Sequence, residues 1–294
     1  MTNAGGYDVG AFLRGLDAIF EEHRGEADAE PYLLAALADC VKVGDGGAEL
    51  SVLNELMGYY RSVSRHEAAI EAANRSLALV TTLGLEESDA GAATLINAAT
   101  ALRAAGRYDD ASLAYHRALA GAEETMEPTD RRLAALHNNL SILYSDTAEP
   151  ERAADELRAA LRVLEASSVD AAGDLDIATT ATNLALVLFT LGQEGEAHDL
   201  AQRSMAIVGH GGHENNGHFA AVVAGQAEAS FRLGNLSDAT AMYERALAII
   251  AECYGVENDY YAVTAANLAQ VMEAAGTRGA GAVGAVGASE ALAP

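Results

Sequence analysis

A spacing of 42 residues recurs along most of this 294-residue chain and constrains its fold more than any other feature of the sequence. A small residue ends a helical pattern at six points, and successive points lie 42, 42, 44, 42 and 42 residues apart. We call these residues the turn positions: Ser64, Gly106, Ala148, Gly192, Gly234 and Gly276. Repeats of this length stack into solenoids, because no single repeat can bury its apolar face alone.

Two further positions keep the same register. Five residues after the first five turn positions the chain has Ala69, Ala111, Ala153, Ala197 and Ala239, and eight residues later it has Leu77, Leu119, Leu161, Met205 and Leu247. We expect the alanines to let the second helix of a repeat approach the first, and the larger residues to fill the layer between repeats.

Each repeat has the pattern of two amphipathic helices joined by a short turn, as in residues 96–119. Residues 64–67 match a capping box, and Pro150 suits the first position of a helix. Four aspartates lie near the expected starts of first helices: Asp89, Asp130, Asp174 and Asp259. The sequence therefore predicts an all-α solenoid of antiparallel helix pairs with about thirteen helices, the last ending near Ala275.

The pattern divides the chain into three segments. Residues 1–45 form an atypical helix pair, with Pro31 in the first turn of its second helix, and we expect this pair to cap the array. Residues 46–276 contain about five and a half repeats. Residues 277–294 are rich in glycine and alanine and are expected to form a flexible tail.

Charge limits the classes of partner. The formal net charge is −25, which opposes attraction to nucleic acid and to anionic membrane surfaces. Neither a signal peptide nor an apolar stretch of about 20 residues is visible, so we expect a cytoplasmic protein. Cys40 and Cys253 fall on distant helices and on apolar faces, which predicts two buried thiols and no disulfide.

The repeats resemble the tetratricopeptide repeat, in the longer variety of kinesin light chains and many bacterial repeat proteins. Three later repeats carry related stretches at residues 139–144, 183–185 and 267–269. The clearest repeat carries the resemblance at Asn97, Ala99, Leu102, Gly106, Tyr108, Ala111, Tyr115, Ala118 and Leu119. The resemblance covers about residues 46–276 and implies a right-handed superhelix, whose first helices line a concave groove that holds an extended peptide or a partner's helix.

Asparagines recur in or beside that implied groove: Asn54, Asn97, Asn138, Asn139, Asn183 and Asn267. An amide both donates and accepts, so such a row could bind the backbone of an extended ligand, or it could instead bond neighbouring helices. The row has two departures, Glu55 beside Asn54 in the first repeat and Gly225 in the fifth.

Arginines provide a second candidate set. Arg61 and Arg103 hold equivalent positions, and Arg232 lies one residue beyond that position in the fifth repeat. They could select an acidic peptide, or they could be solvated side chains paired with nearby acids. The carboxylate clamp of chaperone-binding repeat proteins relies on groove lysines, whereas the one lysine, Lys42, lies outside the repeats.

No catalytic motif is visible, and no cofactor is expected. His210, His213 and His218 are close enough in sequence to consider a metal, but glycine-containing spacers favour a plain loop. The leading hypothesis is a non-enzymatic scaffold that binds a protein or peptide segment. A peptide-responsive regulatory sensor is the second hypothesis, and a metal-dependent enzyme at these histidines is a weaker third. A sensor of that kind usually carries a DNA-binding domain, for which residues 1–45 are too short and too acidic.

Overall fold

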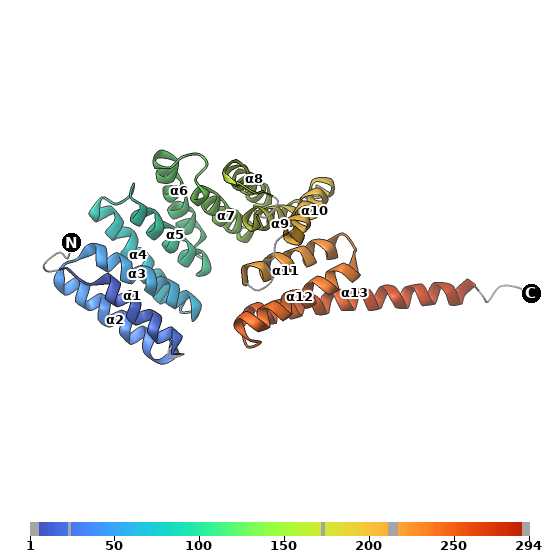
Figure 1. Ribbon diagram of the computed structural model, residues 1–294, viewed down its shortest axis with the longest axis horizontal. Coiled ribbons are helices and arrows are strands. Elements are labelled where there is room, and N and C mark those ends of the chain that lie inside the picture. The colour runs from blue at the N-terminus through green and yellow to red at the C-terminus, as the bar shows by residue number, and fades with distance from the viewer. Residues whose placement is uncertain (1–5, 23–24, 172–173, 211–216, 290–294) are drawn as a thin grey trace, which may run out of the picture. The chain divides into compact units, whose positions relative to one another are not determined.

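The computed structural model describes the backbone of residues 6–22, 25–171, 174–210 and 217–289, and these residues form thirteen helices and no strand (Figure 1). The helices are α1 (Val9–Glu21), α2 (Gly25–Val43), α3 (Gly46–Ser62), α4 (His66–Leu83), α5 (Asp89–Ala104), α6 (Tyr108–Thr125), α7 (Arg131–Asp146), α8 (Pro150–Ser167), α9 (Leu175–Thr190), α10 (Glu194–His210), α11 (Gly217–Arg232), α12 (Leu236–Tyr254) and α13 (Asp259–Ser289). The prediction of an all-α chain of antiparallel helix pairs is confirmed.

The helices fall into two compact units, which are described separately. The first unit comprises Met1–Thr147 and contains α1 to α7, and the second comprises Ala148–Pro294 and contains α8 to α13. Helices α1 and α2 belong to the same unit as α3 to α7, so the proposed capping role of residues 1–45 concerns one end of that unit.

The first five turn positions have left-handed backbone, which explains why glycine and other small residues recur there. The values of φ are 56° at Ser64, 74° at Gly106, 59° at Ala148, 72° at Gly192 and 80° at Gly234. The next N–H then donates to the carbonyl five residues earlier, at 2.8 to 2.9 Å, in the pairs Arg65–Tyr60, Arg107–Leu102, Gln193–Leu188 and Asn235–Ser230. Such a bond closes the end of the first helix and lets the second start at once.

This geometry corrects the capping-box prediction. Ser64 is the left-handed residue that ends α3, and α4 starts at His66 with Arg65 as its N-cap and no side-chain capping bond. A serine at a left-handed position cannot also cap the next helix from the extended conformation that an N-cap needs. The capping-box prediction is therefore wrong, because the turn between the two helices is one residue too tight for it.

First helices start with the chemistry that the sequence predicted. Asp130 and Asp174 accept N-cap hydrogen bonds, and Asp89 lies in the first turn behind the N-cap Ser88. Pro150 is confirmed at the start of α8. Pro31 is not in a first turn, however, because α2 already begins at Gly25 and contains the proline inside it.

The alanines five residues after the turn positions are at most 1% exposed, as predicted, but the larger residues do not fill the core layer. Met205 is 37% exposed, and of its equivalents only Leu161 is buried. The buried residues lie one position earlier and are small: Ser76, Ala118, Ala160, Ser204 and Ala246. One residue turns a side chain by about 100° around a helix, which moves the larger residues to the edge of the contact.

The structure also tests the predictions for the two cysteines, for the end of the last helix and for membrane-spanning segments. Cys40 is buried and Cys253 is exposed, so burial of the second thiol was wrong, and neither forms a disulfide. Helix α13 runs through Gly276 to Ser289 instead of ending near Ala275, in keeping with the high helix propensity of the alanines between the glycines. No helix in the described part of the chain is long and apolar enough to cross a membrane.

Candidate peptide-binding surface

The first helices of successive repeats lie side by side within each unit. In the first unit, Asn97 of α5 donates to Asn54 of α3 at 3.1 Å, and Arg103 of α5 pairs with Asp146 of α7 at 2.6 Å. In the second unit, Arg232 of α11 donates to Thr190 of α9 at 3.3 Å. Residues of equal or adjacent register therefore share one surface in each unit, which we call the first-helix face.

Four of the predicted asparagines already have partners. Asn54 donates to Thr94 at 3.1 Å besides accepting from Asn97, so this pair joins α3 to α5. Asn138 donates to the carbonyl of Ala134 in its own helix at 3.0 Å, and Asn267 hydrogen-bonds the hydroxyl of Tyr243. These amides support the interpretation that the row holds neighbouring elements together.

Asn139 and Asn183 are different. Each is half-buried on a first-helix face, Asn139 in α7 and Asn183 in α9, nine residues before a turn position. Neither side chain has a hydrogen-bond partner among the described residues. They are the two amides of the row that the structure leaves available to a ligand.

Two of the three candidate arginines are neutralised. Arg103 and Asp146 are both more than half buried in their ion pair, and Arg232 also donates to Glu228 at 2.7 Å. Arg61 is exposed and has no ion pair among the residues that the structure describes. The structure therefore does not bring the three arginines together as one cationic set.

Two buried tyrosines of second helices, Tyr115 and Tyr243, hydrogen-bond residues of the first helices. The sequence did not indicate them as site residues. The hydroxyl groups of Tyr115 and Thr100 lie 2.8 Å apart, and the hydroxyl of Tyr243 donates to Glu228 at 3.0 Å. Both tyrosines lie nine residues after a turn position, and each contacts the residue six before that position. Burial and, second, the carboxylate of Glu228 raise the pKa of Tyr243. The repeat register was the signal that could have located these contacts.

Gly225 explains the gap in the asparagine row. A Cβ at this position would lie 2.7 Å from Cγ2 of Thr182 in α9. Thr182 is buried and its hydroxyl lies 2.7 Å from that of Ser204, so it has little freedom to move. Helix α11 packs too closely on α9 for an asparagine side chain.

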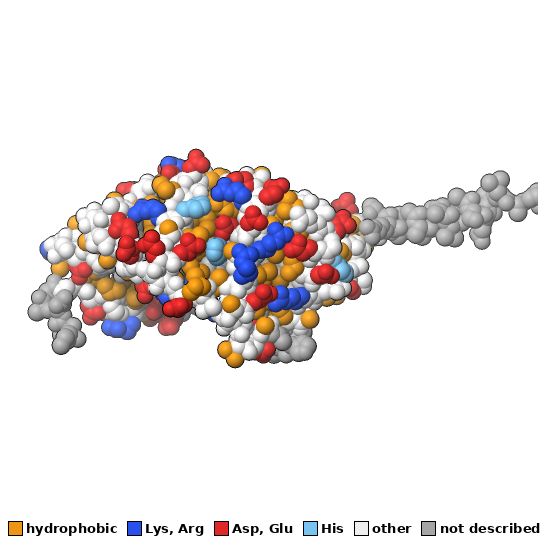
Figure 2. Space-filling view, turned by 90° about the horizontal axis from the view of Figure 1, so that it is seen from above, with side chains coloured by type: hydrophobic (Ala, Val, Ile, Leu, Met, Phe, Trp, Pro, Cys, Tyr) orange, Lys and Arg blue, Asp and Glu red, His pale blue; other side chains and the backbone are white. Residues whose placement is uncertain are grey.

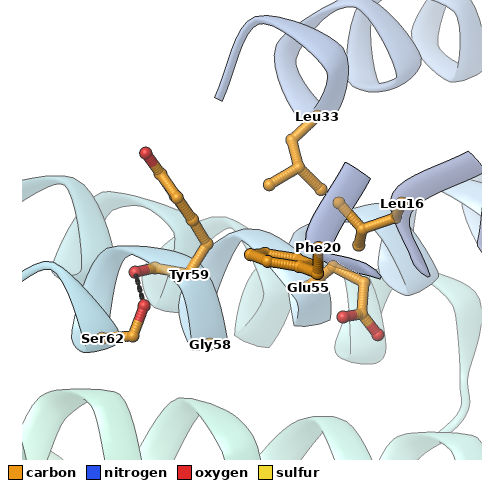
Figure 3. A pocket seen from close by; sticks show the side chains of 7 residues that line it. All are labelled: Leu16, Phe20, Leu33, Glu55, Gly58, Tyr59 and Ser62. Carbon is orange, nitrogen blue, oxygen red and sulfur yellow. Dashed lines mark hydrogen bonds between the residues drawn. The ribbon is translucent and has the colours of Figure 1, made fainter. Parts of the chain in front are cut away.

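A pocket of about 230 Å³ opens in the first unit between α1, α2 and α3 (Figure 3). Its lining residues are Leu16, Phe20, Leu33, Glu55, Gly58, Tyr59 and Ser62. Glu55 holds the register of the asparagines, and its pKa is raised by burial and then by the nearby charge of Asp17. No sequence pattern predicted this pocket, although Glu55 is a departure from the repeat pattern.

Comparisons with known proteins agree with this geometry. Family models of the tetratricopeptide repeat match residues 91–166 and 177–208. No curated protein matches the sequence significantly. The chain contains tetratricopeptide repeats over these residues.

Solved structures with the same fold include kinesin light chain-like repeats. The TPR-like repeats of a Podospora anserina kinesin light chain candidate align with a TM-score of 0.59 and 19% identity, over 71% of this chain and 97% of that one. RapI without ligand aligns with a TM-score of 0.61 and 16% identity, over 89% and 74% of the two chains. NprR in complex with its cognate peptide NprX aligns with a TM-score of 0.56 and 14% identity, over 90% and 71%. At these identities the likeness shows the fold alone.

The metal-site hypothesis concerns three histidines whose side chains the structure does not describe. His213 lies outside the described residues, and the side chains of His210 and His218 are not described either. Elsewhere in the described chain, no group of three or more His, Cys, Asp or Glu side chains could hold a metal ion.

Acidic side chains lie across the face shown in Figure 2, with basic side chains scattered among them.

Proposed function

We propose that this tetratricopeptide repeat protein is a non-catalytic scaffold that holds a protein or peptide segment against a first-helix face. The observation that carries the proposal is that each unit has, on its own first-helix face and at the same register, one half-buried amide without a partner among the described residues: Asn139 in the first unit and Asn183 in the second. The structural neighbour NprR, solved with its cognate peptide, supports the choice of a peptide as ligand. The net charge of −25 favours a protein partner over nucleic acid or an anionic membrane.

An amide suits this role because it can donate to a peptide carbonyl and accept from a peptide N–H at the same time. Both side chains are half-buried, so in the free protein solvent water is the alternative partner of each amide. A bound backbone would replace that water with a direct pair of hydrogen bonds, which is the contact that gives affinity without dependence on ligand sequence. Specificity would then depend on side-chain contacts elsewhere on the face.

The test is a peptide-display selection on the full chain, followed by titration of the selected peptides. Asn139→Ala and Asn183→Ala should each weaken binding by about 2- to 12-fold, the effect of losing roughly 0.5–1.5 kcal/mol of hydrogen bonding. Asn138→Ala is the matched control, because Asn138 donates within its own helix. Peptides that bind the Asn139→Ala/Asn183→Ala double variant with wild-type affinity would remove these amides from the proposal, and a selection that yields no peptide would contradict it altogether.

A second candidate is a sensor that changes shape when it binds a peptide. The fold likeness to RapI and NprR and the presence of two compact units favour it over a metal-dependent enzyme. Small-angle scattering of the full chain, with and without a selected peptide, separates the sensor from the static scaffold. A ligand-dependent change in the radius of gyration supports the sensor, whereas unchanged dimensions support the scaffold.

A further inference from the structure

The pocket between α1, α2 and α3 combines an apolar floor with an acidic rim. Leu16 and Leu33 are buried, whereas Phe20 remains 49% exposed. In Figure 3, the side chains of Leu16 and Phe20 come from α1 and those of Glu55 and Tyr59 from α3. Its volume of about 230 Å³ is smaller than the roughly 300 Å³ at which pockets for whole small molecules begin, so it suits one large side chain.

The walls of the pocket are held by contacts that do not depend on a ligand. The hydroxyl of Tyr32 in α2 donates to the carbonyl of Phe12 in α1 at 3.0 Å, and the two rings stack with centroids 5.7 Å apart. The hydroxyl of Tyr60 in α3 donates to Glu30 in α2 at 3.2 Å. These bonds tie all three helices together, so the pocket is preformed.

The carboxylate of Glu55 is the unusual group in this pocket. It is half-buried and has no hydrogen bond or ion pair with any described residue. Its pKa is raised by burial and then by Asp17, with no contribution from a basic group. The nearest candidate cation along its helix, Arg61, therefore does not neutralise it. A half-buried carboxylate beside another carboxylate is stabilised by an added positive charge.

The apolar surface also extends along α1. Leu13 and Phe20 are exposed on this helix and lie seven residues apart, with the exposed Asp17 between them. On this face of α1, two apolar side chains therefore flank a carboxylate. The pocket has the same combination, because Phe20 and Tyr59 line it together with Glu55. The same combination on two facing helices favours a ligand with matching apolar and basic groups.

We propose that this pocket receives a leucine or aromatic side chain of a bound protein segment, and that an adjacent arginine or lysine of that segment pairs with Glu55 and Asp17. The proposal rests on the scaffold function and names the class of segment that the first unit selects. A second copy of this chain is a poor occupant, because its sequence contains 43 acidic residues against 18 basic ones.

The test uses three synthetic peptides with the central sequences Arg-Leu-Arg, Gln-Leu-Gln and Glu-Leu-Glu in an otherwise identical alanine-glycine background. Fluorescence anisotropy with the full chain should give the order Arg above Gln above Glu. Glu55→Gln should weaken the Arg-Leu-Arg peptide by up to about fivefold, as expected for an ion pair near the surface, and leave the Gln-Leu-Gln peptide unchanged. Phe20→Ala should weaken all three peptides, because it removes part of the apolar lining.

Glu123→Gln is the matched control, since it makes the same change in net charge at an exposed position of α6. Equal binding of the Arg and Glu peptides, or an unchanged affinity in Glu55→Gln, overturns the proposal. The proposal would also be overturned if sedimentation showed that the protein dimerises and that Phe20→Ala abolishes the dimer. The occupant of the pocket would then be a second copy of this chain. If selected peptides depend on Asn139 and Asn183 but not on Glu55, the pocket proposal fails and the scaffold function stands.

Discussion

The turn positions allow a direct energetic test of the fold. Ser64 and Gly106 both have left-handed backbone in the first unit, with φ of 56° and 74°. A residue with a Cβ loses about 1–2 kcal/mol in this conformation, while glycine loses about 0.5–1 kcal/mol more entropy on folding. Gly106→Ala should therefore destabilise the unit by about 1 kcal/mol and Ser64→Gly should stabilise it by about 1 kcal/mol.

The open surroundings of Gly106 mean that the stability change in Gly106→Ala reports the backbone conformation alone. A Cβ built there would meet no atom within 4 Å, so the loss would come from the backbone and not from a clash. Gly58, inside α3 of the same unit, has equally open surroundings and ordinary helical backbone. The identical change Gly58→Ala should therefore have the opposite sign and stabilise by about 0.5–1 kcal/mol.

Equilibrium unfolding in urea, followed by circular dichroism, measures all three variants. With a slope of roughly 1–3 kcal/mol per molar urea, a change of about 1 kcal/mol moves the midpoint by about 0.3–1 M. All three sites lie in the first unit and should shift the same transition. If Gly106→Ala and Gly58→Ala shifted the midpoint in the same direction, the left-handed assignment of the turn would be refuted.

Three other predictions follow from packing and charge. Gly225→Ala should destabilise the second unit by about 1–3 kcal/mol. Gly195→Ala is the control, because its added Cβ meets no atom within 4 Å, and it should stabilise the unit by about 0.5–1 kcal/mol. Equal melting temperatures of the two variants would contradict the close contact of α11 with α9. The pKa of Glu55 is raised above its ordinary 4.5, so the contribution of Glu55 to stability falls as the pH rises through that raised pKa. Glu55→Gln should therefore melt at a higher temperature than wild type at neutral pH and at the same temperature below about pH 4. A difference in melting temperature that stays constant across this pH range would refute the prediction. Tyr243→Phe should cost at least about 1 kcal/mol, because it removes the hydroxyl that donates to Glu228 and hydrogen-bonds Asn267. An unchanged melting temperature would show that these two bonds contribute nothing.

The regular parts of the fold were predictable because every repeat restates the same constraint. Gly106 and Ala111 hold their roles in each repeat, and both are confirmed by the left-handed turn and the buried alanine. The error at Leu119 has the same origin: the period locates a helix pair, but one residue of rotation decides whether Ala118 or Leu119 enters the core. The capping-box prediction at Ser64 failed because a four-residue motif carries no information about the sign of φ.

The candidate site was less predictable because it depends on which neighbours are close in space. Equal register could not show that Asn97 bonds Asn54 while Asn139 bonds no described residue. The pocket was harder still to predict, because α1 lacks the repeat motif and no periodicity shows that its residues line a pocket together with Glu55. Only the distances between helices reveal which amides and carboxylates already have partners.

Charge pairing on the first-helix face reverses the expected selectivity. Arginines on this face were candidates to attract an acidic peptide, but Arg103 is neutralised by Asp146. Glu55, by contrast, has no cationic partner among the described residues, and Asp17 adds a like charge beside it. An ion pair that is already formed offers little to a ligand, while an uncompensated half-buried carboxylate gains from an incoming cation. In the first unit, a basic segment therefore has more to gain by binding than an acidic one, and the three-peptide titration measures that difference directly.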